Sequence, residues 1–138
     1  MSSSELRYLI AASELAAQMQ NVKQTDVANK LRVTKVSTYN AMARLRDKGL
    51  IEKGERKIVL TEQGREVLNA YLTIIHFISA HLSVHCGTPK DQAYEDALNA
   101  ACAFSDETRN GVANFIKSGM PGIRYASAAG NGEQTNDR

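Results

Sequence analysis

The chain has 138 residues, of which 43% are hydrophobic, and its 17 Lys and Arg and 15 Asp and Glu give a net charge of +2. This length suffices for one domain, or for a small domain with an attached dimerisation element, and excludes two independent cores. No stretch approaches about 18 consecutive apolar residues, and the polar start MSSSELR lacks a secretory signal, so we expect a cytoplasmic protein with no membrane segment.

The first predicted element is a helix that begins near Ser4, as its cap, and ends at about Met19. Its apolar residues recur at the three- and four-residue steps of a helical stripe. We expect this stripe to pack across the elements that follow. It comprises Leu6, Leu9, Ile10, Ser13, Ala16 and Ala17.

Residues 24–64 follow the order helix, short turn, helix and basic hairpin, which predicts a winged helix-turn-helix. The first of these helices runs from Thr25 to Leu31 and is short, as this motif requires. After a turn of three residues, Thr34 is placed to cap the second helix, Lys35 to Lys48.

The second helix has one side for packing and one side for solvent. Thr38, Ala41, Met42 and Leu45 fall at helical spacing, so we expect them to be buried. The opposite side carries a cation, an amide, a phenol and small apolar groups, which suit base edges in a DNA major groove. The residues on this outward side are Lys35, Val36, Tyr39, Asn40 and Ala43.

We assign two kinds of DNA contact to this module, one to bases and one to the phosphate backbone. Lys35, Tyr39 and Asn40 are predicted to contact bases, with Val36 against a thymine methyl. The residues predicted to hold phosphates are Thr34, Ser37, Arg44, Arg56 and Lys57.

A basic hairpin follows, in which Ile51–Lys53 pairs with Lys57–Leu60 around a tip that contains Gly54. Between residues 22 and 57 ten Lys and Arg face four Asp and Glu, whereas elsewhere seven face eleven. Such a concentration of positive charge attracts phosphates and makes binding sensitive to salt. Two alternatives stay open: the hairpin is solvated and idle, or the cations are ordinary solvated side chains.

From Thr61 to about His85 the sequence predicts a long helix with two apolar rows. We expect one row to face the chain's own core and the other to face a partner subunit. The second row consists of Val67, Ile74, Phe77, His81 and Val84. Two shorter helices follow, the first capped by Thr88 with Pro89 at its first position and the second capped by Ser105.

The expected fold class is therefore mainly α with a small β-wing, a winged helix-turn-helix followed by a helical dimerisation region. We divide the chain into a DNA-binding domain (1–64), a long linking helix with the dimerisation region (65–118), and a tail (119–138) whose composition predicts disorder. Cys86 and Cys102 form no disulfide pattern, and we expect both to be buried and reduced.

Several of these features stand together in one order along the chain. They are Tyr8-Leu9, Leu31-x-Val33, Ser37, Leu45, Leu50-Ile51 and the closure Leu60-Thr61-x-x-Gly64, with a long helix and two short ones after them. Between about Glu5 and Ile116 this pattern resembles the diphtheria-toxin-repressor family, especially compact members such as the manganese transport regulators. The DNA-binding half is also similar to other winged-helix families, including the multiple-antibiotic-resistance regulators. The resemblance implies a homodimeric transcriptional repressor controlled by a bound metal ion.

The resemblance also implies a metal site built from the first helix, the long helix and the helix after it. Arg7 and Ile10 stand where that family has acidic ligands, and Leu98 and Ala101 stand at two further ligand positions. Because an arginine repels a divalent cation, we do not expect manganese sensing. His76 and Cys102 remain candidates for a softer divalent transition metal such as zinc or copper, as does the pair His81 and His85. The alternative is that these side chains are merely solvated or packed.

The sequence bears on three classes of function. The first is a sequence-specific regulator that binds double-stranded DNA as a homodimer, and the alternative is a winged-helix protein-interaction module without DNA binding. An enzyme is not expected, because the chain has no glycine-rich phosphate loop, no Gly-x-Ser-x-Gly elbow and no metal-hydrolase spacing.

Overall fold

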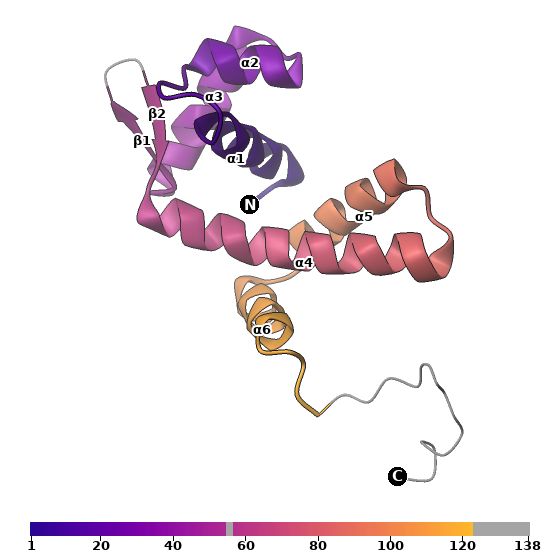
Figure 1. Cartoon of the computed structure of the whole chain (residues 1–138). Helices are drawn as coiled ribbons and strands as arrows, with labels where there is room; N and C mark the ends of the chain where they lie inside the picture. The colour runs from indigo at the N-terminus through magenta and orange to yellow at the C-terminus, as the bar shows by residue number, and fades with distance from the viewer. Residues whose placement is uncertain (55–56, 123–138) are drawn as a thin grey trace, which may run out of the picture.

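The computed structural model describes residues 1–54 and 57–122, which form a mainly helical protein with one small antiparallel sheet (Figure 1). This confirms the predicted fold class. The elements in chain order are α1 (Ser3–Ala16), α2 (Gln24–Leu31), α3 (Lys35–Asp47), β1 (Ile51–Gly54), β2 (Lys57–Leu60), α4 (Glu62–Cys86), α5 (Lys90–Ala103) and α6 (Asp106–Lys117).

The start of α1 differs from the prediction. Ser2, not Ser4, caps this helix: its hydroxyl accepts the Glu5 N–H at 3.1 Å, and the Glu5 carboxylate accepts the Ser2 N–H at 3.2 Å. This reciprocal capping box satisfies two backbone donors that the helix itself leaves free. The helix also ends at Ala16 instead of Met19.

The helix-turn-helix agrees closely with the prediction from the sequence. The chain leaves α2 through Arg32, whose φ of 56° reverses its direction, and Thr34 then accepts the Ser37 N–H at 3.1 Å to cap α3. The two-stranded wing pairs Ile51 with Leu60 at its base. Its tip, residues 55–56, lies outside the described residues, and so does most of the tail predicted to be disordered.

The motif Thr61-x-x-Gly64 joins the wing to α4. The Thr61 hydroxyl accepts the Gly64 N–H at 2.9 Å, and it donates to the Gly49 carbonyl at 2.7 Å. Gly64 packs so tightly that a Cβ on it would lie 2.0 Å from the Leu50 carbonyl oxygen. Only glycine allows this approach of the helix to the start of the wing.

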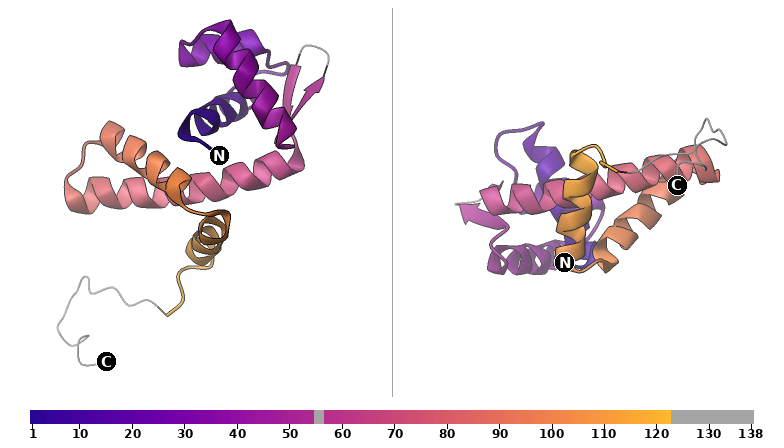
Figure 2. Two further views of the ribbon diagram at one scale, coloured as in Figure 1. Left: turned by 180° about the vertical axis from the view of Figure 1, so that it is seen from behind. Right: turned by 90° about the horizontal axis from the view of Figure 1, so that it is seen from below.

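Helix α4 is the central element of the second half of the chain. Helix α5 folds back alongside it, and α6 crosses it on the side away from α1 (Figures 1 and 2). The side chains of Leu68, Tyr71, Ile74 and Ile75 on α4 are buried in the core that also contains the α1 stripe. Pro89 occupies the N-cap of α5, so the prediction that Thr88 caps this helix is wrong, whereas Ser105 caps α6 as predicted.

The corner between α5 and α6 is built around a buried arginine. Arg109 donates to the carbonyl oxygens of Ala101 at 3.1 Å and Phe104 at 2.6 Å, and its guanidinium lies 4.1 Å from the centre of the Tyr71 ring. Burial raises the pKa of Tyr71 to about 12, although Arg109 opposes this rise. Because both carbonyls belong to the end of α5, this side chain ties the corner to α4.

By length and composition alone, α4 could cross a membrane, since an 18-residue window has a mean hydropathy of 1.5. In this protein α4 is packed against α1, α5 and α6, with part of its apolar surface in the core. The cysteines differ from expectation, because Cys86 is exposed and only Cys102 is partly buried.

Candidate nucleic-acid interface

Helix α3 turns one clean face to solvent. Val36 is 70% exposed and Tyr39 is 54% exposed, and Lys35, Ser37 and Asn40 are exposed beside them. The opposite face of α3 is fully buried, with Thr38, Ala41, Met42 and Leu45 in the core. The predicted rotation of α3 is therefore confirmed, except that Ala43 is half-buried. Contact of this face with DNA stays a prediction.

The N-terminus of α3 is an exposed end of this face. Thr34 donates its hydroxyl proton to Ser37 Oγ at 2.9 Å and accepts the Ser37 N–H, so the two hydroxyls are held together at the first turn. Lys35 lies between them in the sequence and is exposed. The free N–H groups and the positive end of the helix dipole favour an anion at such a place.

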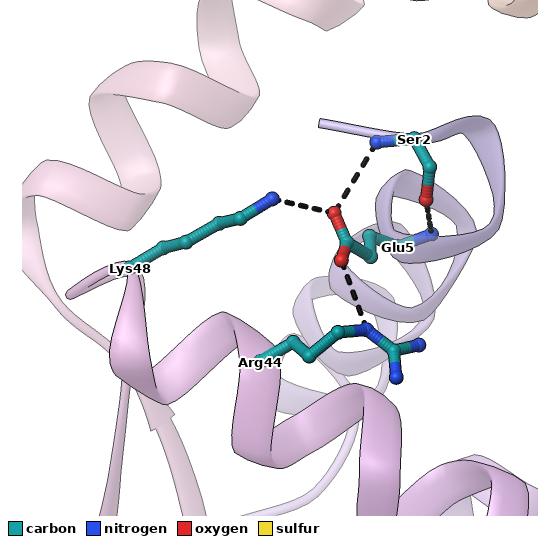
Figure 3. A network of polar contacts seen from close by, with 4 residues as sticks. All are labelled: Ser2, Glu5, Arg44 and Lys48. Carbon is teal, nitrogen blue, oxygen red and sulfur yellow. Dashed lines mark hydrogen bonds and ion pairs between the residues drawn. The ribbon is translucent and has the colours of Figure 1, made fainter.

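A buried carboxylate fixes the other end of α3. Glu5 on α1 accepts hydrogen bonds from Lys48 Nζ at 2.6 Å and from Arg44 Nε at 3.0 Å, in addition to the Ser2 N–H (Figure 3). The Glu5 side chain is only 8% exposed, whereas those of Arg44 and Lys48 are 52% and 45% exposed. Burial raises the pKa of Glu5, but the hydrogen bonds from Lys48, Ser2 and Arg44 outweigh it and leave the pKa below its ordinary value.

This network changes the role expected for Arg44. The sequence assigned Arg44 to phosphate contact alone, yet its Nε is already bonded to Glu5. The guanidinium is therefore oriented by α1, and its half-exposed remainder faces solvent on the winged-helix module. Sequence reasoning missed Glu5 altogether. The signal that could have found it is the Ser-x-x-Glu spacing from Ser2 to Glu5.

The wing lies beside α3 and is held in place by buried side chains and by a backbone hydrogen bond. Ile58 and Leu60 are buried, and the alternating residues Lys57 and Val59 are exposed. The Ile58 N–H also donates to the Val22 carbonyl at 2.7 Å, which ties β2 to the segment before α2. Lys57 therefore projects from a fixed strand, as a phosphate contact requires. Arg56, the other predicted wing contact, lies outside the described residues.

The residues at the implied metal positions do not fit a divalent cation. Arg7 on α1 is held by Glu95 on α5 in two hydrogen bonds, Nη2–Oε1 at 2.6 Å and Nη1–Oε2 at 2.8 Å. At the other positions, Ile10, Leu98 and Ala101 are buried apolar side chains without a donor atom. An occupied arginine and three hydrocarbon side chains cannot replace carboxylate and imidazole ligands.

The softer site proposed for His76 and Cys102 gains no third ligand. Within residues 1–54 and 57–122 no three His, Cys, Asp or Glu side chains are grouped so that they could hold a metal ion. His76 is exposed on α4, and burial raises the pKa of the Cys102 thiol, which disfavours the thiolate that binds metals. His81 and His85 stack on each other, with their ring centres 5.3 Å apart. Metal binding at His76 and Cys102 stays a prediction.

Comparison with protein-family models and with curated protein sequences finds no match. Several solved structures are similar in fold. The hypothetical protein SSo2273 from Sulfolobus solfataricus is 22% identical with a TM-score of 0.66, over 86% of this chain and 91% of that one. The manganese regulator SloR is 19% identical with a TM-score of 0.67, over 86% of this chain and 55% of its own.

A third similar structure is the metal-dependent transcriptional regulator MtsR, which is 17% identical with a TM-score of 0.70 over 88% of this chain. The chain spans 56% of the length of MtsR, so it corresponds to about half of such a regulator. SloR and MtsR are regulators, not enzymes. At this level of identity the likeness establishes the architecture: the chain has the winged-helix fold of the diphtheria-toxin-repressor type of regulator.

Proposed function

We propose that this protein is a sequence-specific transcriptional regulator that binds double-stranded DNA as a homodimer. The observation that carries the proposal is the exposed face of α3, where Lys35, Tyr39 and Asn40 stand in solvent while the opposite face is locked into the core. A helix held by its buried side and exposed on its outer side can enter a major groove.

The chemistry of this face suits base reading. An amide such as Asn40 can form two hydrogen bonds with adenine, Lys35 can donate to guanine, and Val36 can contact a thymine methyl. The backbone contacts come from around it: Thr34 and Ser37 at the helix N-terminus, Arg44 as oriented by Glu5, and the wing. Phosphate contacts position the protein, and base contacts select the sequence.

The charge distribution supports DNA as the partner. The cations are concentrated between residues 22 and 57, which include α2, α3 and the wing, whereas the rest of the chain is acidic on balance. Such a patch accelerates association with a polyanion and makes the affinity fall steeply with salt. A protein-docking module would show no such dependence with duplex DNA.

The homodimer is supported by the C-terminal part of the apolar row of α4 that we expected to face a partner, whereas Ile74 of this row is buried in the chain's own core. Toward the end of α4, α5 leaves this row open: Phe77 is half-buried, His81 is exposed and Val84 is 74% exposed. A second copy could cover these side chains, and two-fold symmetry would place two α3 helices on successive turns of one face of the duplex. The protein would act as a repressor in the cytoplasm. Its binding to DNA would not depend on manganese, because the carboxylate and imidazole ligands for that ion are missing.

Selection from a random duplex library tests the proposal. The wild-type protein should enrich a motif with two related half-sites, and Asn40→Ala should lose the preference at one position of each half-site. Glu62→Ala, a change of an exposed side chain outside the patch, is the matched control and should enrich the same motif as the wild type. A library that returns no motif and no salt-dependent binding would favour the protein-interaction module.

A further inference from the structure

The two halves of the protein are joined by one bidentate ion pair. Arg7 comes from the middle of α1, in the DNA-binding module, and Glu95 comes from the middle of α5. Both terminal nitrogens of the guanidinium bond to the carboxylate, one to each oxygen, at 2.8 Å and 2.6 Å. This two-point geometry restrains rotation as well as distance, so it sets how α1 and α5 lie relative to each other.

Among the ion pairs of the described residues, this one alone crosses between the module up to Leu60 and the helices α4–α6. The pairs of Glu5 with Arg44 and Lys48 and of Glu14 with Lys30 lie within the DNA-binding module, and that of Asp106 with Arg109 lies within α6. Side-chain polar contacts therefore couple the two halves at Arg7 and Glu95 and at the hinge around Thr61.

Packing at this junction is less extensive than packing within the second half of the chain. Helix α1 touches α4 and α5 much less extensively than α5 and α6 cover α4. Directly beside the ion pair lies a cavity of about 250 Å³ between α1, α2 and α5. Its lining includes Arg7, Ile10, Glu14 and Tyr94. Because apolar contact is interrupted here, the orientation of the junction depends on directional bonds more than it would in a dense interface.

We propose that the Arg7–Glu95 pair takes the place of a metal ion as the tie between α1 and α5, so that the DNA-binding module is held in one orientation without any metal. The tie is intramolecular, present whenever the protein is folded, and indifferent to chelators. Both side chains are partly exposed, at 37% and 44%, so salt screens the pair and weakens the tie. The importance of this ion pair for operator binding rests on the proposed function. The existence of the tie between α1 and α5 does not depend on that function.

The experiment measures the orientation directly and uses no DNA. One spin label is placed on the native, exposed Cys86 at the end of α4 and another on Asn29→Cys, an exposed position on α2; Cys102, a candidate metal ligand, is kept, since burial raises the pKa of its thiol and slows its labelling. Labelled chains are diluted with unlabelled protein, so that the distances measured by electron resonance lie within one chain. We expect one narrow distance distribution that is unchanged by chelator or by added zinc.

Three variants decide the outcome. Arg7→Gln and Glu95→Gln should each broaden the distribution, and the double variant should be no broader than either, because each single change already breaks the pair. Glu14→Gln is the matched control, since it removes a comparably exposed pair that stays within the DNA-binding module. The proposal is overturned if Glu95→Gln gives the same distance distribution as this control. It is also overturned if zinc narrows the distance distribution of the labelled protein in which Arg7 and Glu95 are both intact.

A second measurement links the tie to operator binding. With chelator present, Glu95→Gln should weaken binding to a selected duplex by up to about five-fold, as expected for a partly exposed pair. If the distance distributions behave as described but no duplex is bound by the wild type, the proposed function fails and the tie stands. If the duplex binds equally well to all variants while the distributions broaden, the tie does not control recognition, and that part of the proposal is wrong.

Discussion

Glu5 Oε2 on α1 accepts a hydrogen bond from Arg44 Nε on α3 at 3.0 Å, across 39 positions of the sequence. The same carboxylate accepts Lys48 through its other oxygen. A single buried acid thus sets the position of the candidate recognition helix and the direction of one of its cations. The first prediction follows from this relationship.

Glu5→Gln should lower the free energy of unfolding by about 1–3 kcal/mol near neutral pH, because charged hydrogen bonds to Lys48 and Arg44 are replaced by weaker ones. Urea unfolding measures this. Glu14→Gln, which removes an exposed pair at 3.4 Å, should change stability by less than about 1 kcal/mol. An equal loss in both variants would contradict the structural role given to Glu5.

The contribution of Glu5 should also depend on pH. Its pKa in the folded state lies below its ordinary value, so the stabilisation is fully present above the unfolded pKa and is lost as the pH falls through the folded pKa. The difference in unfolding free energy between wild type and Glu5→Gln should therefore shrink between about pH 5 and about pH 3. A difference that stays constant down to the acid limit would show that the carboxylate charge is not what stabilises the protein.

Gly64→Ala should destabilise the protein by at least about 3 kcal/mol, because the new Cβ would lie 2.0 Å from the Leu50 carbonyl oxygen and force α4 away from the wing. Gly111→Ala provides the matched comparison, since nothing lies within 4 Å of the added Cβ in α6. That change should be neutral or stabilising by about 0.5–1 kcal/mol. Thermal unfolding compares the two, and similar melting temperatures would exclude the close approach at Gly64.

Asn40→Ala and Lys57→Ala should affect DNA binding in different ways. Loss of the amide should cost about 1–3 kcal/mol on the selected duplex and little on a shuffled one, because only a matched base profits from it. Loss of the lysine should weaken binding to both duplexes alike. It should also reduce the salt dependence of the affinity by the amount expected for about one phosphate contact. Fluorescence anisotropy with both duplexes measures these effects. The same uniform loss in the two variants would refute the division into base and phosphate contacts.

Val84→Asp should weaken self-association at least about ten-fold, because a charge on the open row of α4 would be buried twice in a symmetric dimer. Sedimentation equilibrium measures the association constant. Asn69→Asp adds the same charge at an exposed position on α4 outside this row and should leave the constant unchanged. A dimer that tolerates Val84→Asp would place the interface elsewhere.

The features that could be predicted from the sequence are those that depend on residues close to one another in the chain. The rotation of α3 follows from the helical spacing of Thr38, Ala41, Met42 and Leu45, and it agrees with the structure because a helix with one apolar face has one way to pack. The caps Thr34 and Ser105 were recognised for the same reason. At the first helix three adjacent serines offer the same hydroxyl, and the choice of Ser2 is made by Glu5 three residues later.

What could not be predicted depends on how distant segments meet. Arg7 and Glu95 are 88 positions apart, and they meet only because α5 folds back along α4 toward α1. The sequence indicated that Arg7 would repel a metal ion, but nothing in it identified Glu95 as the ion-pair partner of Arg7. The link of Glu5 to Arg44 and Lys48 is of the same kind, since no helical spacing relates α1 to α3.

The most direct test of the central claim is the affinity of the protein for a selected duplex and a shuffled one, measured over a range of salt concentrations in the presence of chelator. We predict specific binding that needs no metal, whose logarithm falls linearly with the logarithm of salt concentration, and that Lys35→Ala weakens more on the selected duplex than on the shuffled one. Equal, salt-insensitive binding to both duplexes, unaffected by Lys35→Ala, would contradict the claim that the exposed face of α3 reads DNA.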